Sequence, residues 1–158
     1  MGINSSIVRT DRIQINAPID FVWDILTDVE KYGEWNPFTP RARTDFKIGS
    51  PARLLVRMGP TKFRITERVC AFEKPRLIAW CREFGTSWLL FVVREQHLEP
   101  ISDTSCSYHN VDLLSGVLSS IVSLFFGGYM RRGFGDVGVG LKLRAETLYR
   151  DTENRISP

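Results

Sequence analysis

The sequence is poor in the residues that bind metals or act as nucleophiles. Its three cysteines lie far apart, without a Cys-x-x-Cys pair, and it has only two histidines. A zinc site is therefore not expected, and an odd number of cysteines argues against the disulfide framework of a small secreted protein. A phosphate-binding loop and a Gly-x-Ser-x-Gly nucleophile elbow are also absent. We therefore predict neither a metal nor a cofactor, and we expect a cytoplasmic location.

The sequence also lacks a secretory signal and a basic cluster. Residues 1–6 contain no apolar h-region. The 21 basic and 18 acidic residues are spread along the chain, whereas nucleic-acid-binding proteins gather basic residues on one element, so no nucleic-acid partner is expected. The length of 158 residues predicts a single globular domain over residues 1–158, with a flexible tail after residue 152. A monomer and a homodimer both remain open.

The longest uncharged stretch covers residues 113–130 and reaches the length of a membrane span. Four serines and three glycines dilute it, however, and its apolar residues recur at helical spacing. No transmembrane span is therefore predicted. We interpret the stretch as a lid over a cavity, with docking on a membrane surface or on another protein as the alternative.

The periodicity of the apolar residues predicts the order of the elements. Residues 12–16 alternate as in a strand, Pro18 opens an amphipathic helix that ends near Thr27, and a second helical turn follows over residues 28–32. Strands are predicted between residues 41 and 113, punctuated by turn residues at 49–51, 59–60, 73–75, 85–87 and 100–103.

A long amphipathic helix is predicted over residues 128–150. Its first half contains four glycines, each of which costs about 1 kcal/mol relative to alanine in a helix. We therefore expect these glycines to serve the structure or the function. In particular, Gly138 follows Phe134 by one helical turn and is predicted to leave empty volume for a ligand.

Short motifs along nearly the whole chain carry a family resemblance: Ile15-Asn16-Ala17-Pro18, Val22-Trp23, Leu26, Asp28, Tyr32, Trp35-Asn36-Pro37, Val69 to Pro75, Leu77, Trp80, Leu98-Glu99-Pro100, Thr104, Leu141-Lys142 and Ala145-Glu146. In this order they resemble the helix-grip, or SRPBCC, superfamily, which includes START-type lipid-transfer proteins, the major birch pollen allergen and bacterial polyketide cyclases. The resemblance implies an α+β fold, in which a curved antiparallel sheet of about seven strands surrounds the long C-terminal helix and two short helices follow the first strand.

The turns also predict which strand residues face the helix. A turn at residues 73–76 places Val69 opposite Trp80 and Glu67 opposite Arg82, about 4.5–5.5 Å apart. Continued through the next turns, this register puts Trp80 near Val92 and Leu98 near Cys106. With the helix and loop aromatics it predicts a ligand-binding set: Trp35, Phe38, Phe63, Ile65, Glu67, Trp80, Arg82, Trp88, Leu90, Arg94, Gln96, Tyr108, Asn110, Phe126, Met130, Phe134 and Gly138.

This set is mainly apolar with a few polar groups, as in small-molecule pockets. Because an isolated buried charge is very costly, we predict that Glu67 and Arg82 form an ion pair, which either contacts a ligand or only stabilises the sheet. His97 and His109 fall on the opposite, solvent-facing side, with Glu95 opposite His109. For Trp35, ordinary core packing is the alternative to a place at the cavity mouth.

Three functions remain open at this point. The first is a carrier or binding protein for a small hydrophobic molecule such as a lipid, quinone, sterol or polyketide-like compound. The second is a polyketide-type cyclase that uses the same cavity, for which Glu67, Arg82 and Tyr108 are the catalytic candidates. The third is a module that docks on a partner or a membrane through residues 113–126. The absence of a catalytic motif favours the first.

Overall fold

The computed structural model describes residues 4–156, except for the side chains of Met58 and Ile156. Within this range it contains eight strands and one long helix, together with short helices near the N-terminus. In chain order the elements are β1 (Ser5–Arg9), β2 (Ile13–Ile15), α1 (Ile19–Thr27), the 3-10 helix η1 (Val29–Lys31), α2 (Tyr32–Trp35), β3 (Arg41–Arg43), β4 (Pro51–Met58), β5 (Thr61–Glu73), β6 (Leu77–Glu83), β7 (Phe91–Ser102), β8 (Ser105–Ser115) and α3 (Ser119–Ile156).

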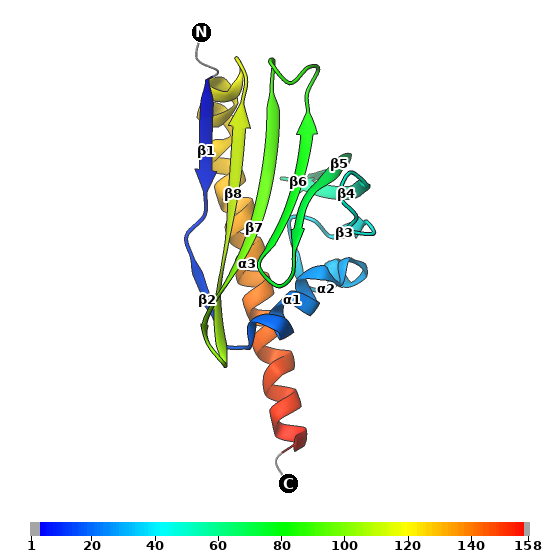
Figure 1. Cartoon of the computed structure of the whole chain (residues 1–158), viewed down its shortest axis with the longest axis vertical. Helices are drawn as coiled ribbons and strands as arrows, with labels where there is room; N and C mark the ends of the chain where they lie inside the picture. The colour runs from blue at the N-terminus through cyan, green and yellow to red at the C-terminus, as the bar shows by residue number, and fades with distance from the viewer. Residues whose placement is uncertain (1–3, 157–158) are drawn as a thin grey trace.

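The strands form one antiparallel sheet that curves along α3 (Figure 1). Their order across the sheet is β1-β8-β7-β6-β5-β4-β3, and β2 also pairs with β8. The strand expected over residues 12–16 is β2, whereas β1 was not predicted, which gives eight strands instead of about seven. The helix-grip α+β fold is confirmed, with α3 running along the whole sheet and projecting beyond it (Figure 1).

The strand register differs from the prediction in two of three hairpins. Val69 lies opposite Trp80 as predicted, but Trp80 lies opposite Arg94 instead of Val92, and Leu98 opposite Tyr108 instead of Cys106. Both errors are two-residue shifts, because the connecting turns lie one position later in the chain than assumed. Since side chains alternate with a period of two, a shift of two leaves each residue on the predicted face of the sheet.

Helix α3 is longer than predicted at both ends. It begins at Ser119 and continues to Ile156, so the expected lid over residues 113–130 is in fact the end of β8 and the first turns of α3. The expected tail after residue 152 is likewise helical as far as Ile156. No helix within residues 4–156 is long and apolar enough to cross a bilayer.

Close approach to neighbouring elements explains three of the glycines in α3. A methyl group at Gly140 would collide with the backbone carbonyl oxygen of Trp35, and one at Gly138 would lie 2.7 Å from Ile13 Cδ1. At Gly133 it would lie 2.5 Å from the Phe38 ring. The glycines therefore let α3 pack directly against α2, the loop that follows it and the sheet.

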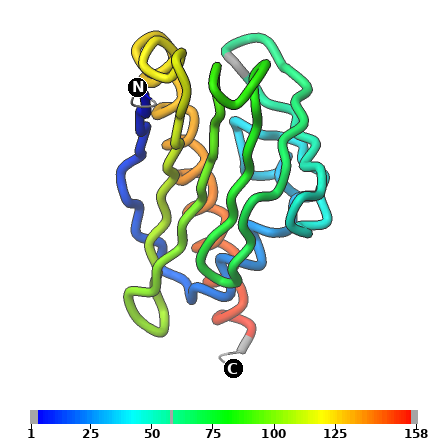
Figure 2. Tube along the Cα trace, turned by 45° about the horizontal axis from the view of Figure 1, so that its top comes forward, coloured from blue at the N-terminus to red at the C-terminus, as the bar shows by residue number. Residues whose placement is uncertain are grey.

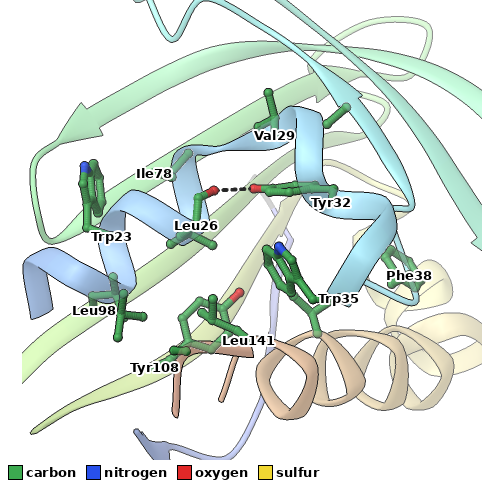
Figure 3. Packing of buried hydrophobic residues seen from close by; sticks show 14 of the residues in the cluster. Trp23, Leu26, Val29, Tyr32, Trp35, Phe38, Ile78, Leu98, Tyr108 and Leu141 are labelled. Carbon is green, nitrogen blue, oxygen red and sulfur yellow. Dashed lines mark hydrogen bonds between the residues drawn. The ribbon is translucent and has the colours of Figure 1, made fainter. Parts of the chain in front are cut away.

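A large apolar core fills the space between α1, α2, the sheet and α3. Figure 3 shows Trp23 and Leu26 of α1, Trp35 of α2 and Leu141 of α3 converging on this space. The Tyr32 hydroxyl donates a hydrogen bond of 2.7 Å to the Leu26 carbonyl oxygen, which ties the second short helix to the first. These contacts hold the loop after α2 in place over the interior.

One disulfide was not anticipated from the sequence. Cys70 on β5 and Cys81 on β6 are bonded, with their Cα atoms 6.0 Å apart, while Cys106 is free and buried. The prediction considered the cysteine count and Cys-x-x-Cys spacing, whereas here antiparallel pairing brings two distant cysteines together. Within the described part of the chain, no group of three or more His, Cys, Asp or Glu could hold a metal ion.

Two alanine substitutions in α3 are expected to have opposite effects. Gly140→Ala should lower the free energy of unfolding by about 1–3 kcal/mol, because the Trp35 backbone cannot rotate away from the added methyl group. Gly135→Ala should raise the free energy of unfolding by about 1 kcal/mol, because the added methyl group would have no neighbour within 4 Å and alanine favours the helix. Urea unfolding of both variants tests this, and equal effects would contradict the close approach at Gly140.

Candidate functional site

A small cavity lies between the loop after α2, the inner face of the sheet and α3. Its volume is about 30 Å³, which is enough for one or two water molecules. The ligand-sized hollow expected from the sequence is therefore not open in this structure. The cavity wall consists of Tyr32, Asn36, Phe38, Thr39, Leu54, Trp80, Arg94, Gln96, Asn110, Phe134 and Val137.

Phe38 separates this cavity from a larger groove on the surface. The groove has a volume of about 360 Å³ and is lined by Phe38 together with Pro37, Arg57, Gly59, Tyr129, Arg132, Gly133 and Asp136. The Phe38 ring lies edge-on to the Phe134 ring, with the ring centres 5.0 Å apart, and sits over the bare backbone of Gly133. Phe38 is thus the side chain shared by the buried cavity and the open groove.

Among the described residues, Arg94 is the only positively charged one in the cavity wall. It extends from β7 and is only 16% exposed. Its guanidinium carbon lies 4.5 Å from the centre of the Phe134 ring and 5.9 Å from that of Phe38. Contacts of this kind between a cation and an aromatic face are attractive, and more so away from water.

Two buried carboxylates balance the charge of Arg94. Its Nε donates a hydrogen bond of 3.3 Å to Asp112 Oδ1, directly across the β7–β8 pair, while its Nη1 lies 3.9 Å from Glu67 Oε1. The second oxygen of each carboxylate is buried without a hydrogen-bond partner. The cluster is therefore incompletely satisfied, which is costly in a dry interior.

The cluster shifts the pKa of two of its members. Burial raises the pKa of Asp112 to about 6, and the Glu67 carboxylate adds to this effect while Arg94 opposes it. Burial lowers the pKa of Arg94, but the neighbouring Glu67 and Asp112 outweigh it and raise that pKa overall. Arg94 therefore stays charged, and Asp112 titrates near pH 6.

A second polar network lies beside Arg94 on the same face. The Tyr108 hydroxyl donates to Gln96 Oε1 at 2.8 Å and accepts from Asn110 Nδ2 at 3.0 Å. Burial raises the pKa of Tyr108, so its hydroxyl remains protonated. Gln96 and Asn110 line the cavity, whereas Tyr108 lies behind them and fixes their orientation.

Apart from Arg82 and Gly138, the predicted site residues divide into five groups. The cavity wall contains Phe38, Trp80, Arg94, Gln96, Asn110 and Phe134, and Glu67 and Tyr108 lie directly behind it. Ile65, Met130 and Trp35 pack into the core, and Leu90 belongs to a separate apolar cluster with Val8 and Leu114. The side chains of Phe63, Trp88 and Phe126 are exposed at the surface.

Two specific predictions about the site are wrong. The ion pair of Glu67 is formed with Arg94 and not with Arg82, whose guanidinium instead stacks on Phe84 at 4.8 Å. The volume expected beside Gly138 is filled, because Ile13 and Tyr108 occupy it. Sequence reasoning also missed Asn36 and Thr39 in the cavity wall, although the turn-forming Asn-Pro-Phe-Thr-Pro segment was a signal for a loop with a fixed shape.

The histidines lie on the face of the sheet opposite to the cavity, as predicted, but His109 is only 4% exposed and does not face solvent. The rings of His97 and His109 stack with their centres 4.8 Å apart, and Glu95 contacts His97 at 2.8 Å instead of His109. Burial lowers the pKa of His109, and the nearby His97 lowers it further. Neither ring reaches the cavity.

Comparison with known proteins places the chain in a family. Residues 7–136 match the family described as polyketide cyclase / dehydrase and lipid transport, and the protein belongs to this family. No protein with a curated function matches it in sequence.

Solved structures share the fold at low sequence identity. The Zhui aromatase/cyclase from Streptomyces sp. R1128 is 16% identical, with a TM-score of 0.73 over 90% of this chain and 94% of that one. A START superfamily protein from Mycobacterium smegmatis is 19% identical, with a TM-score of 0.65 over 93% and 99%. Norcoclaurine synthase from Thalictrum flavum, in complex with dopamine and hydroxybenzaldehyde, is 12% identical, with a TM-score of 0.60 over 88% of each chain.

The titration of Asp112 predicts a pH-dependent contribution to stability. The unfolded chain releases this proton near pH ~4, whereas the folded protein holds it to about pH 6. Between these values the folded state binds more protons, so this contribution falls as pH rises. Relative to Asp112→Asn, the free energy of unfolding of the wild type should fall by up to about 3 kcal/mol from pH ~4 to ~7, at about 1.4 kcal/mol per pKa unit.

Chemical denaturation of both proteins across this pH range measures the difference. The exposed Asp103 provides a control, and Asp103→Asn should leave the pH profile of the wild type unchanged in shape. If the free energy of unfolding of the wild type stays constant or rises with pH relative to that of Asp112→Asn, folding does not raise the pKa of Asp112 and the prediction is wrong.

Proposed function

We propose that the protein binds a small, mainly apolar molecule between the sheet and α3, with an oxygen-bearing end of that molecule against Arg94. A carrier or binding protein is the corresponding role. The observation that carries the proposal is the charged guanidinium of Arg94, which lies at the wall of the cavity beside the rings of Phe134 and Phe38. In the described structure its Nη atoms donate no hydrogen bond to either carboxylate. A carbonyl, phenolate or carboxylate oxygen fits this position.

Gln96 and Asn110 extend the polar side of the site. Both lie beside Arg94 in the cavity wall, while Trp80, Leu54, Phe134 and Val137 supply apolar surface. A ligand with one polar end and an aromatic or alicyclic body matches this division. Norcoclaurine synthase has been solved in complex with dopamine and hydroxybenzaldehyde, which are small aromatic molecules with polar groups, on the same fold. Lipids, quinones and polyketide-like compounds also combine a polar end with an apolar body.

The ligand needs more room than the closed cavity offers. Rotation of the Phe38 ring would join the cavity to the groove, because this ring borders both. The backbone around it is held by hydrogen bonds from Thr39 N to Asn36 Oδ1 at 2.7 Å and from Arg57 N to the Phe38 carbonyl oxygen at 2.8 Å. We therefore assign the opening to the side chain of Phe38 and not to the loop as a whole.

A cyclase-type enzyme is the second candidate. Its support is Asp112, whose pKa of about 6 suits proton transfer near neutral pH. Asp112, Glu67 and Tyr108 all lie behind the cavity wall, however, and Arg94 alone connects the carboxylates to the cavity. Binding is therefore the better supported role, with Arg94 as the residue that would touch a substrate in either case.

The role of Arg94 is tested with two small aromatic probes, 2-naphthoate and 2-naphthol. Arg94→Gln should weaken binding of 2-naphthoate at least about tenfold, because a hydrogen bond to a charged group contributes roughly 1.5–3 kcal/mol. Binding of 2-naphthol should weaken less. Arg82→Gln is the matched control, since Arg82 lies on the same face but stacks on Phe84 outside the cavity wall.

Titration calorimetry measures both affinities, and circular dichroism verifies that each variant is folded. Equal binding by the wild type and Arg94→Gln, or a loss in Arg82→Gln alone, would place the site elsewhere. Native mass spectrometry of the purified wild type should in addition reveal a co-purifying apolar molecule.

The role of Phe38 is tested by the glycine beneath it. Gly133→Ala places a methyl group against the Phe38 ring and should prevent it from closing, so 2-naphthoate should associate and dissociate several-fold faster than in the wild type. Gly135→Ala adds a methyl group without a neighbour within 4 Å and should leave both rates unchanged. Stopped-flow quenching of protein fluorescence gives the rates, and identical kinetics in both variants would exclude Phe38 as the barrier.

A further inference from the structure

An apolar stripe at the start of α3 faces solvent. Ile121, Leu124 and Phe125 are 54, 79 and 73% exposed, and their spacing puts them on one side of the helix. The opposite side of the same turns is already used, because Val122 and Met130 pack on the apolar cluster of the sheet. Soluble monomers rarely expose apolar side chains in such a contiguous group.

The β6–β7 loop extends this stripe. Trp88 in that loop is 67% exposed, and its carbonyl oxygen accepts a hydrogen bond of 3.0 Å from Val117 N, just before α3. Leu118 N donates similarly to the Leu89 carbonyl oxygen at 3.1 Å. We refer to the combined exposed side chains as the apolar end surface, which consists of Trp88, Val117, Ile121, Leu124 and Phe125.

Basic residues predominate in the chain segments that form this end of the molecule, and the exposed acidic residues Glu83 and Asp136 lie at their borders. Residues 51–66, 84–93 and 113–135 together carry only basic charges, although the whole chain is nearly balanced: Arg53, Arg57, Lys62, Arg64, Arg131 and Arg132. The Tyr129 hydroxyl binds the β4–β5 hairpin to α3 through Gly59 N at 2.7 Å. Figure 2 shows this hairpin, the β6–β7 loop and the start of α3 at the same end of the molecule.

We propose that the apolar end surface docks on an anionic lipid bilayer. Aromatic and aliphatic side chains enter the interfacial region, with Trp88 suited to the headgroup level, and the surrounding arginines and lysine contact lipid phosphates. The groove beside Phe38 lies next to this end, since Arg57, Gly59, Tyr129 and Arg132 line it. An apolar ligand could then pass between bilayer and groove without crossing water.

The charge pattern favours a bilayer over a second copy of the chain. In a symmetric dimer the same surface is present on both partners, so two sets of mostly basic residues would face each other, with only Glu83 and Asp136 at their borders as acidic residues. An anionic membrane instead neutralises all the basic residues at once. The docking does not depend on the interior ligand, so the two proposals can fail independently.

Vesicle cosedimentation tests the docking. The wild type should sediment with vesicles of phosphatidylcholine mixed with phosphatidylglycerol, much less with phosphatidylcholine alone, and less again as salt is raised. The double variant Leu124→Ser/Phe125→Ser should lose this binding, whereas Leu143→Ser should keep it. Leu143 is the matched control because it is 62% exposed on the same helix but lies outside the apolar end surface.

The basic residues are tested separately. Arg131→Ser/Arg132→Ser should weaken binding to the mixed vesicles roughly thirtyfold, from about a factor of five per charge near an anionic surface. The Leu124→Ser/Phe125→Ser variant should still bind 2-naphthoate as the wild type does, which separates loss of docking from loss of the interior site.

Three outcomes would overturn the proposal. They are wild-type protein that stays in the supernatant with both vesicle types, unchanged binding by Leu124→Ser/Phe125→Ser, and equal loss in Leu143→Ser. Analytical ultracentrifugation tests whether a second copy of the chain covers the surface instead. If the wild type is a dimer that does not bind vesicles, and Leu124→Ser/Phe125→Ser is a monomer, the surface serves self-association.

Discussion

The close approach of α3 to the rest of the protein determines both the shape and the chemistry of the interior. Backbone without side chains at Gly133, Gly138 and Gly140 lets the helix touch the Phe38 ring, Ile13 and the Trp35 carbonyl group. Because the helix lies so close, the interior shrinks to about 30 Å³ and Arg94 is held against Phe134. A helix with larger side chains at these positions would have to stand further away and leave the charged cluster in contact with water.

Much of the fold follows from local sequence signals. Apolar periodicity located α1 and the strands, and turn residues gave the hairpins, because both signals act over a few neighbouring residues. The end of α1 at Thr27 and the pairing of Val69 with Trp80 are confirmed. The long helix was underestimated because residues 119–127 were assigned to a lid and the residues after 152 to a flexible tail, although the apolar residues of the first segment recur at helical spacing.

The details of the site depend on geometry that no local pattern contains. Glu67 and Arg94 lie on strands that are not neighbours, and the long arginine side chain crosses β6 to reach the carboxylate. The register of β5 and β6 was predicted correctly at Val69 and Trp80, so the partner of Glu67 was missed because it lies on β7, one strand beyond the neighbour. The cavity volume depends on how closely α3 packs, and the disulfide depends on the distance between two strands, so neither could be derived from composition.

The shared contact of Phe38 with Gly133, Phe134 and Arg94 makes access and recognition interdependent. If the Phe38 ring rotates outward as proposed, the Arg94 guanidinium keeps only Phe134 of its two aromatic neighbours. Because it has then lost one attractive contact, the guanidinium would bind a ligand oxygen more readily. In the proposed complex, the apolar body of the ligand would fill the space left by the ring and replace the lost contact. A ligand without the oxygen would therefore stabilise the open position of the Phe38 ring less than a ligand that carries it. Selectivity would then act on the opening of the cavity as well as on the contacts made inside it.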